Sequence, residues 1–221
     1  MKKNKIYPDS KVELQEITAK FYDSILNFAT FGGYSLFIKK AIKSINLIQN
    51  DKVVDFGAGT GRNALLMNKY LSGKSEILGL EISESMIKQF KKKTKNHQNI
   101  NVINQRIDQP FELDKKFDKV FVSFVFHGFP FEVQKNIIQN AFNALNENGE
   151  FIILDFNEFV TDETPFYFRI PFKIIECKYA FDYVERDWKP ILSEFGFGEF
   201  REKTFLKKHI RLLKAKKGAI K

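Results

Sequence analysis

Cysteine is nearly absent from this chain of 221 residues, and Cys177 is the only one. A single thiol excludes an internal disulfide framework and offers no thiolate cluster for a metal ion. No apolar run approaches the roughly 20 residues that a membrane-spanning helix needs. The lysine-rich start also lacks the apolar core of a secretory signal. The sequence therefore predicts a cytoplasmic globular protein that holds no metal ion.

Acidic residues are outnumbered, with 27 Asp and Glu against 36 Lys and Arg, which gives a net charge of +9. Such an excess favours an anionic partner, either nucleic acid, an acidic membrane surface or an acidic small molecule, although lysine runs are also typical of solvated helix faces. The 25 phenylalanines indicate an aromatic cavity, an apolar contact surface or a Phe-rich core. A chain of this length supports one full core rather than two, so we expect a single domain over residues 1–221.

A glycine-rich turn is the strongest local signal. Two valines lead into Asp55, and glycines follow at alternate positions, namely Gly57, Gly59 and Gly61. Helical spacing of apolar residues then begins at Ala64, so the pattern predicts a strand, a tight turn and a helix. Glycine allows positive φ and lets a ligand approach the bare backbone. A dinucleotide site would need G-x-G-x-x-G, but Arg62 stands where that third glycine belongs, which disfavours a dinucleotide.

Strand and helix patterns alternate along most of the chain. Helical spacing covers residues 12–25, 36–48, 64–71, 131–146 and 185–195, and a further helix is expected to begin at Ser83, whose hydroxyl suits an N-cap. Strand patterns cover residues 53–56, 76–81, 100–104, 117–126 and 150–155, followed by a hairpin of 197–206 and 209–215. This alternation predicts an α/β fold with a doubly wound, mostly parallel sheet and a C-terminal antiparallel hairpin. The helices within residues 1–48 are expected to form a cap over the ligand site.

An aromatic segment at residues 156–183 interrupts this alternation. It contains Pro165 and Pro171 among several phenylalanines and tyrosines. We expect a long irregular connection, which in a compact domain is either a substrate lid or a packing element.

The acidic strand end followed by G-x-G-x-G resembles motif I of the class I, Rossmann-like S-adenosylmethionine-dependent methyltransferases. Glu81 follows Gly61 by 20 residues at the end of the next strand, where an acidic residue accepts ribose hydroxyls. The resemblance implies S-adenosyl-L-methionine as the cofactor. It implies contacts from Asp55, Gly57, Ala58, Gly59, Gly61, Glu81, Ile82, Met86, Asp108 and Ser123.

The resemblance also implies how these contacts are divided. Asp55 and the glycine turn face the methionine part, and Glu81 holds the ribose. Ile82 and Met86 lie near the adenine. Asp108 either accepts from the adenine amino group or is a solvated loop residue.

Several shorter motifs resemble the ubiquinone/menaquinone C-methyltransferase family. They are Tyr22-Asp23, Thr30-Phe31-Gly32 and the run from Glu81 to Met86. Asn27 sits one place later than the family's asparagine, and His127-Gly128 replaces the family's Arg-Asn after the fourth strand. The resemblance implies methyl transfer to a small hydrophobic or aromatic acceptor, such as a demethylmenaquinone-type quinol.

There are two candidate catalytic residues, Tyr22 from the Tyr-Asp motif of this resemblance and His127 from its place at the end of the fourth strand. An imidazole beside the methyl donor can take a proton from a phenol or enol, so His127 is either a general base or a residue that shapes the pocket.

Other functions stay open at this stage. The charge is compatible with methylation of RNA, but the chain has Ser123-Phe124-Val125-Phe126 where an Asn/Asp-Pro-Pro-Tyr motif would follow the fourth strand. A phospholipid head group is another acceptor, and a non-catalytic cofactor-binding protein would keep the same motifs. The basic balance also favours peripheral contact with an acidic membrane.

Overall fold

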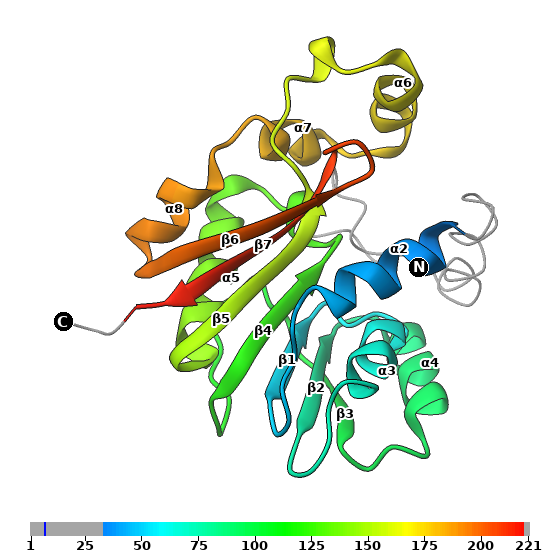
Figure 1. Ribbon diagram of the computed structural model, residues 1–221, viewed down its shortest axis with the longest axis vertical. Helices are drawn as coiled ribbons and strands as arrows, with labels where there is room; N and C mark the ends of the chain where they lie inside the picture. Colours follow the sequence, from blue (N-terminus) through cyan, green and yellow to red (C-terminus); the bar gives the residue numbers. More distant parts are fainter. Residues whose placement is uncertain (1–6, 8–32, 219–221) are drawn as a thin grey trace.

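The structure is a computed structural model that describes Tyr7 and residues 33–218. Within these residues, seven strands form one sheet in the order β3-β2-β1-β4-β5-β7-β6 (Figure 1). Their bounds are β1 Lys52–Phe56, β2 Glu76–Glu81, β3 Ile100–Asn104, β4 Phe117–Ser123, β5 Leu145–Phe156, β6 Phe197–Phe205 and β7 Ile210–Lys217. The first five pair in parallel, whereas β7 pairs antiparallel with β5 and β6 antiparallel with β7. The predicted fold class is confirmed.

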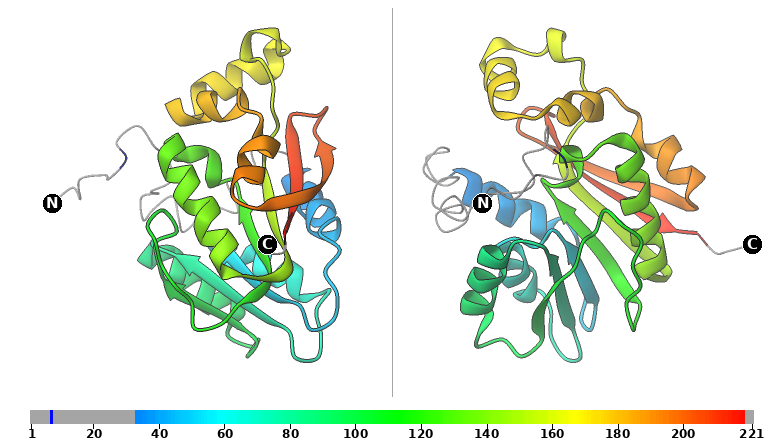
Figure 2. Two further views of the ribbon diagram at one scale, coloured as in Figure 1. Left: turned by 90° about the vertical axis from the view of Figure 1, so that its left-hand side faces the viewer. Right: turned by 180° about the vertical axis from the view of Figure 1, so that it is seen from behind.

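Helices cover both faces of the sheet. Their bounds are α2 Gly33–Lys43, α3 Arg62–Asn68, α4 Glu84–Thr94, α5 Phe131–Ala144, α6 Phe166–Ile175, α7 Lys178–Val184 and α8 Trp188–Glu194. Two short 3₁₀ turns also occur, η1 Phe126–Gly128 and η2 Thr161–Glu163. Helix α5 lies behind the sheet in Figure 1 and in front of it in the right panel of Figure 2. Within the described residues, no helix has both the length and the apolar character needed to cross a membrane.

Alternation along the strands produces one apolar core on each face, because successive strand residues point to opposite sides. Val53 and Phe121 belong to the core beneath α2 and α3. Val54 and Val122, their sequence neighbours, belong to the core beneath α5, α7 and α8. All four are fully buried. Burial on both faces fixes the register and brings the carboxyl ends of the parallel strands to one edge.

Strands β2 and β3 have the predicted bounds, but β4 is shorter than predicted. It ends at Ser123 rather than at residue 126 because Phe124 has a φ of 52°, which an extended strand does not allow. Helix α2 ends before the predicted residue 48, and Asn46 beyond it also has positive φ. Strand β5 begins at Leu145, directly after α5, rather than at the predicted residue 150.

The expectation of an irregular aromatic segment is wrong, since most of it is helical. Pro165 is the N-cap of α6, where its φ of −54° suits a helix start. Helix α7 follows after two residues and packs against η1 and α5. In Figure 1, α6 projects beyond the end of the sheet. The predicted helix of residues 12–25, Tyr22 and most of the cap of residues 1–48 lie outside the described residues, and α2 is the part of the cap that the structure describes.

Candidate functional site

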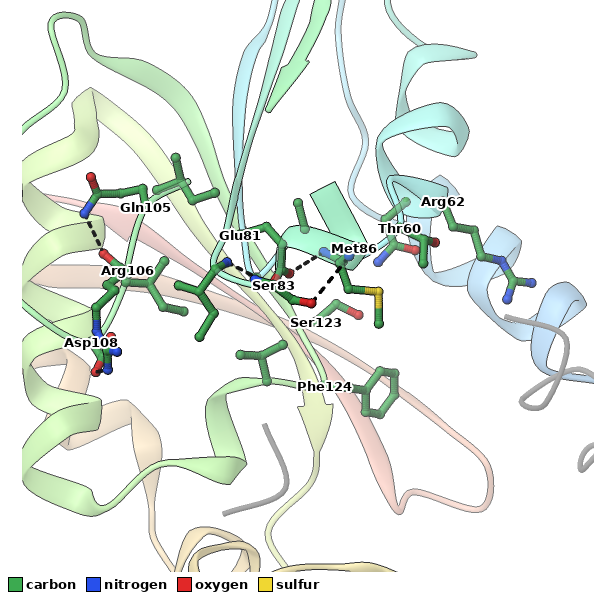
Figure 3. A pocket seen from close by; sticks show the side chains of 18 of the residues that line it. Thr60, Arg62, Glu81, Ser83, Met86, Gln105, Arg106, Asp108, Ser123 and Phe124 are labelled. Carbon is green, nitrogen blue, oxygen red and sulfur yellow. Dashed lines mark hydrogen bonds and ion pairs between the residues drawn. The ribbon is translucent and has the colours of Figure 1, made fainter. Parts of the chain in front are cut away.

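A pocket opens at the carboxyl ends of the first four parallel strands, where ligands bind in open α/β sheets. Four loops line it, residues 57–60 after β1, 81–83 after β2, 105–108 after β3 and 123–125 after β4. Further lining residues are Tyr7, Tyr34, Arg62, Asn63, Leu80, Met86 and Phe129. Glu81 lies between Asp108 and Arg62 in the view of Figure 3.

The three glycines of the turn have different surroundings. All have positive φ, 73° at Gly57, 54° at Gly59 and 78° at Gly61. A Cβ on Gly57 would lie 2.9 Å from Val125, and one on Gly61 would lie 2.8 Å from the Phe90 ring. A Cβ on Gly59 would meet nothing within 4 Å. Gly57 and Gly61 therefore let the turn pack closely, whereas Gly59 faces the open space that a ligand can fill.

Glu81 is held rigidly by backbone amides. Its Oε2 accepts from Gly59 N–H at 2.8 Å, and its Oε1 accepts from Ile82 and Ser83 N–H, each at 2.9 Å. Hydrogen bonds to an ionised carboxylate are short and strong, so three of them fix its orientation. Ser83 also caps α4, as predicted, by accepting from Met86 N–H at 3.4 Å. The carboxylate is thereby ready to accept hydroxyl groups of a bound nucleoside.

Asp55 lies beneath the turn with one carboxyl oxygen unpaired. The residue is 1% exposed, and among the described residues Oδ2 has no hydrogen-bond partner. Burial, with a smaller contribution from the charge of Glu81, raises the pKa of Asp55 to about 8. An unpaired buried carboxyl is costly unless a donor or a cation completes it. A donor or a cationic ligand group that reached Oδ2 would satisfy it.

Asp108 already has partners in this structure. Its Oδ2 accepts from Tyr7 Oη at 2.7 Å and pairs with the guanidinium of Arg106. Burial, together with the hydrogen bond and charge of Asp108, raises the pKa of Tyr7 to about 12. Binding of the adenine amino group by Asp108 remains a prediction, and such a contact shares the carboxylate with two protein donors.

Aromatic side chains surround the end of the pocket beyond the glycine turn. The guanidinium of Arg62 lies 4.8 Å from the centroid of the Tyr34 ring, a cation–π distance. Phe124 lines the same end, and its left-handed backbone is unusual for a bulky residue. Its N–H donates to Leu154 O at 3.0 Å, which anchors the turn to β5. A positive φ held in this way is typical of functional sites.

His127 does not line the pocket. It is 9% exposed in η1, with Nδ1 2.6 Å from Asp155 Oδ1 and Nε2 3.2 Å from Glu176 Oε2. Burial works to lower the pKa of His127, but the charges and hydrogen bonds of Asp155 and Glu176 outweigh it and raise the pKa to about 10. The imidazole is therefore protonated at neutral pH, and in this arrangement it has no lone pair for a substrate proton.

Most residues that the sequence singled out meet around this pocket. Those that line it are Gly57, Ala58, Gly59, Glu81, Ile82, Met86, Asp108 and Ser123. Asp55 and Gly61 lie behind the lining, His127 lies apart, and Tyr22 is outside the described residues. The lining residues that sequence reasoning missed include Tyr7, Tyr34, Arg62, Arg106, Phe124 and Phe129. Phe124 directly follows Ser123, a predicted site residue at a strand end, so its position could have been predicted. Tyr7 precedes any periodic pattern, and nothing in the sequence around it indicates a site residue.

Comparison with known proteins agrees with this geometry. The profile of the methyltransferase domain family matches residues 47–196, so the chain belongs to that family. The S-adenosylmethionine-dependent methyltransferase of Aquifex aeolicus has the same fold, with a TM-score of 0.66 at 17% identity over 92% of this chain and 99% of that one. Human N-acetylserotonin methyltransferase, solved with S-adenosylmethionine, has a TM-score of 0.69 at 13% identity. The match covers 93% of this chain and 57% of the human one.

Two curated relatives are demethylmenaquinone methyltransferases. That of Staphylococcus carnosus is 29% identical over 131 residues, which are 59% of this chain and 54% of the relative. That of Staphylococcus saprophyticus is 30% identical over 117 residues, which are 52% of this chain and 49% of the relative. The chain thus spans about half the length of the curated relatives it matches.

The cofactor of this class is S-adenosyl-L-methionine, and the residues present fit it. The unpaired Oδ2 of Asp55 suits the methionine ammonium, and Glu81 suits the ribose. The open space at Gly59 admits a ligand against the turn.

Proposed function

We propose that this protein is an S-adenosylmethionine-dependent methyltransferase that acts on a small hydrophobic or aromatic acceptor. The observation that carries the proposal is the buried, unpaired Oδ2 of Asp55 beneath a turn whose Gly59 faces open space. Glu81, oriented by three backbone amides, completes a site for a nucleoside that carries a cationic group.

The chain's own residues have a simple task in such a reaction. The bound cofactor supplies a methyl group already activated by its sulfonium charge, so the protein chiefly has to align the acceptor and exclude water. The glycine turn, Asp55 and Glu81 orient one reactant. Tyr34 and Phe124, which both pack against Phe37, give the pocket an aromatic wall against which a flat acceptor is held.

A demethylmenaquinone-type quinol is the acceptor we propose. The support is the name of the curated relatives, together with this aromatic wall. Such an acceptor resides in a membrane, and the net charge of +9 would favour peripheral contact with acidic lipids. The membrane contact is part of the proposal.

The test has two arms. Isothermal titration with S-adenosylhomocysteine examines the cofactor site, and we expect binding that Glu81→Gln weakens. Mass spectrometry after incubation with S-adenosylmethionine and demethylmenaquinol in detergent examines the acceptor, and we expect a product heavier by one methylene. Absence of S-adenosylhomocysteine binding at millimolar ligand would refute the methyltransferase. Binding without quinol methylation would refute the acceptor alone, and sedimentation with acidic vesicles tests the membrane contact.

A further inference from the structure

A buried cluster of charges joins the sheet to the segment that follows β5. His127 in η1 stands between Asp155 at the end of β5 and Glu176 directly after α6. Asp155 binds it twice, because Oδ1 lies 2.6 Å from Nδ1 and Oδ2 accepts from the His127 backbone N–H at 3.2 Å. Glu176 Oε2 lies 3.2 Å from Nε2 on the other side. Three elements far apart in the sequence therefore converge on one imidazole.

The groups that face this imidazole favour its charged form. Asp155 is 1% exposed and Glu176 is 18% exposed at its side chain, so both carboxylates act across a largely dry environment. Tyr183 of α7 is the third titratable neighbour, with its ring centroid 6.3 Å from that of His127. Its own pKa lies well above the usual value because of burial and the charge of Asp155, so it stays neutral. Both ring nitrogens of a charged His127 then donate to carboxylates.

An aromatic chain connects this cluster to the pocket. The Phe156 ring lies 5.0 Å from the His127 ring and 5.0 Å from that of Phe172 in α6. The same Phe156 ring packs at 6.2 Å from Phe124, which lines the pocket. Because packed interiors transmit small displacements, the position of α6 bears on the pocket wall through Phe156.

We propose that His127 is a positioning residue: as an imidazolium between Asp155 and Glu176, it fastens the α6–α7 segment to the ends of β4 and β5 and so fixes the aromatic wall of the pocket. His127 thus acts through Phe156 and Phe124. It exchanges no proton with the acceptor. The inference rests on the proposed function only in assuming that the pocket binds the acceptor. The contacts of His127 with Asp155 and Glu176 are a property of the folded chain.

Nuclear magnetic resonance of the histidine rings tests the charge. The chain has three histidines, so the His127 signals are those that His127→Gln removes. We expect His127 to be doubly protonated at pH 8 and to titrate near pH 10. Glu176→Gln should lower that midpoint by at least one pH unit, whereas the control Glu163→Gln, at an exposed glutamate of η2, should leave it unchanged. Titration below pH 7 in the unaltered protein, or no change with Glu176→Gln, would overturn the proposal.

Limited proteolysis tests the fastening. Trypsin can cleave after Arg169, Lys173 and Lys178, which lie in α6 and α7. At pH 8 we expect Glu176→Gln to speed cleavage in this segment at least fivefold relative to Glu163→Gln and to the unaltered protein. Equal rates would overturn the proposal. Glu176→Gln keeps the His127–Asp155 pair, so the test does not depend on whether His127→Gln folds.

Binding of S-adenosylhomocysteine separates this inference from the proposed function. If the unaltered protein binds it and Glu176→Gln leaves the His127 titration unchanged, the inference fails and the proposed function stands. If the unaltered protein does not bind it while the His127 titration moves as expected, the proposed function fails and the fastening by His127 stands.

Discussion

Asp55 is expected to make cofactor binding depend on pH. Its pKa of about 8 means that the free protein carries a proton on this buried carboxyl at pH 6 to 7. A methionine ammonium against Oδ2 favours the ionised carboxylate, so binding must expel that proton. The affinity for S-adenosylhomocysteine, which carries the same ammonium, should therefore rise about tenfold per pH unit between roughly pH 6 and 7.5.

Isothermal titration in buffers of different ionisation enthalpy measures the expelled proton directly. At pH 6.5 we expect the release of about one proton per ligand, since the pKa of the carboxyl lies well above that pH. Asp55→Asn keeps the shape but cannot ionise, so it should weaken binding and abolish both the proton release and the pH slope. Proton release that persists in Asp55→Asn would refute the assignment of the ammonium to Asp55.

The raised pKa of Asp55 also makes the free energy of unfolding of the ligand-free protein depend on pH. Because the folded-state pKa is raised, the folded protein binds this proton more tightly than the unfolded chain. This stabilising contribution is fully present below about pH 4 and is lost as the pH rises to about 8, by about 1.4 kcal/mol per pH unit at most. Asp55→Asn should remove this slope in urea unfolding between pH 5 and 8. An unchanged slope would contradict the raised pKa.

Three further changes test single contacts. Glu81→Gln should weaken S-adenosylhomocysteine binding about 10- to 100-fold in titration calorimetry, because hydrogen bonds to a charged group contribute about 1.5–3 kcal/mol. Gly61→Ala should lower the free energy of unfolding by about 1–3 kcal/mol through its positive φ and the Phe90 ring, whereas Gly33→Ala, with open space around it, is the control and should not. If Asp108 binds the adenine amino group, Asp108→Asn should lower the affinity for S-adenosylhomocysteine. Tyr7→Phe removes a donor to the same carboxylate, so it should leave that affinity unchanged or raise it.

Much of the fold follows from local pattern. Alternating apolar residues and the glycine turn predict the strands, their parallel direction and the edge where Asp55, Glu81 and Ser123 meet, because the carboxyl ends of parallel strands share one edge. The bounds of β2 and β3 match the sequence pattern for the same reason.

The helices of residues 156–183 were missed because Pro165 and Pro171 were interpreted as breaks, although Arg169 and Lys173 stand at helical spacing in α6. The stop of β4 at Ser123 was missed too, since nothing in an apolar run marks the positive φ of Phe124.

The sequence by itself determined the fold class, since the alternation of strand and helix patterns suffices for it, and its resemblance to a known family singled out eight residues that line the pocket. Only the tertiary structure decided the protonation of Asp55 and His127. A pKa depends on burial and on charges from distant segments, and the two groups differ in these respects. Asp55 is buried near another carboxylate and keeps its proton, whereas His127 lies between two carboxylates and gains one. Those neighbours come together only when the chain is folded.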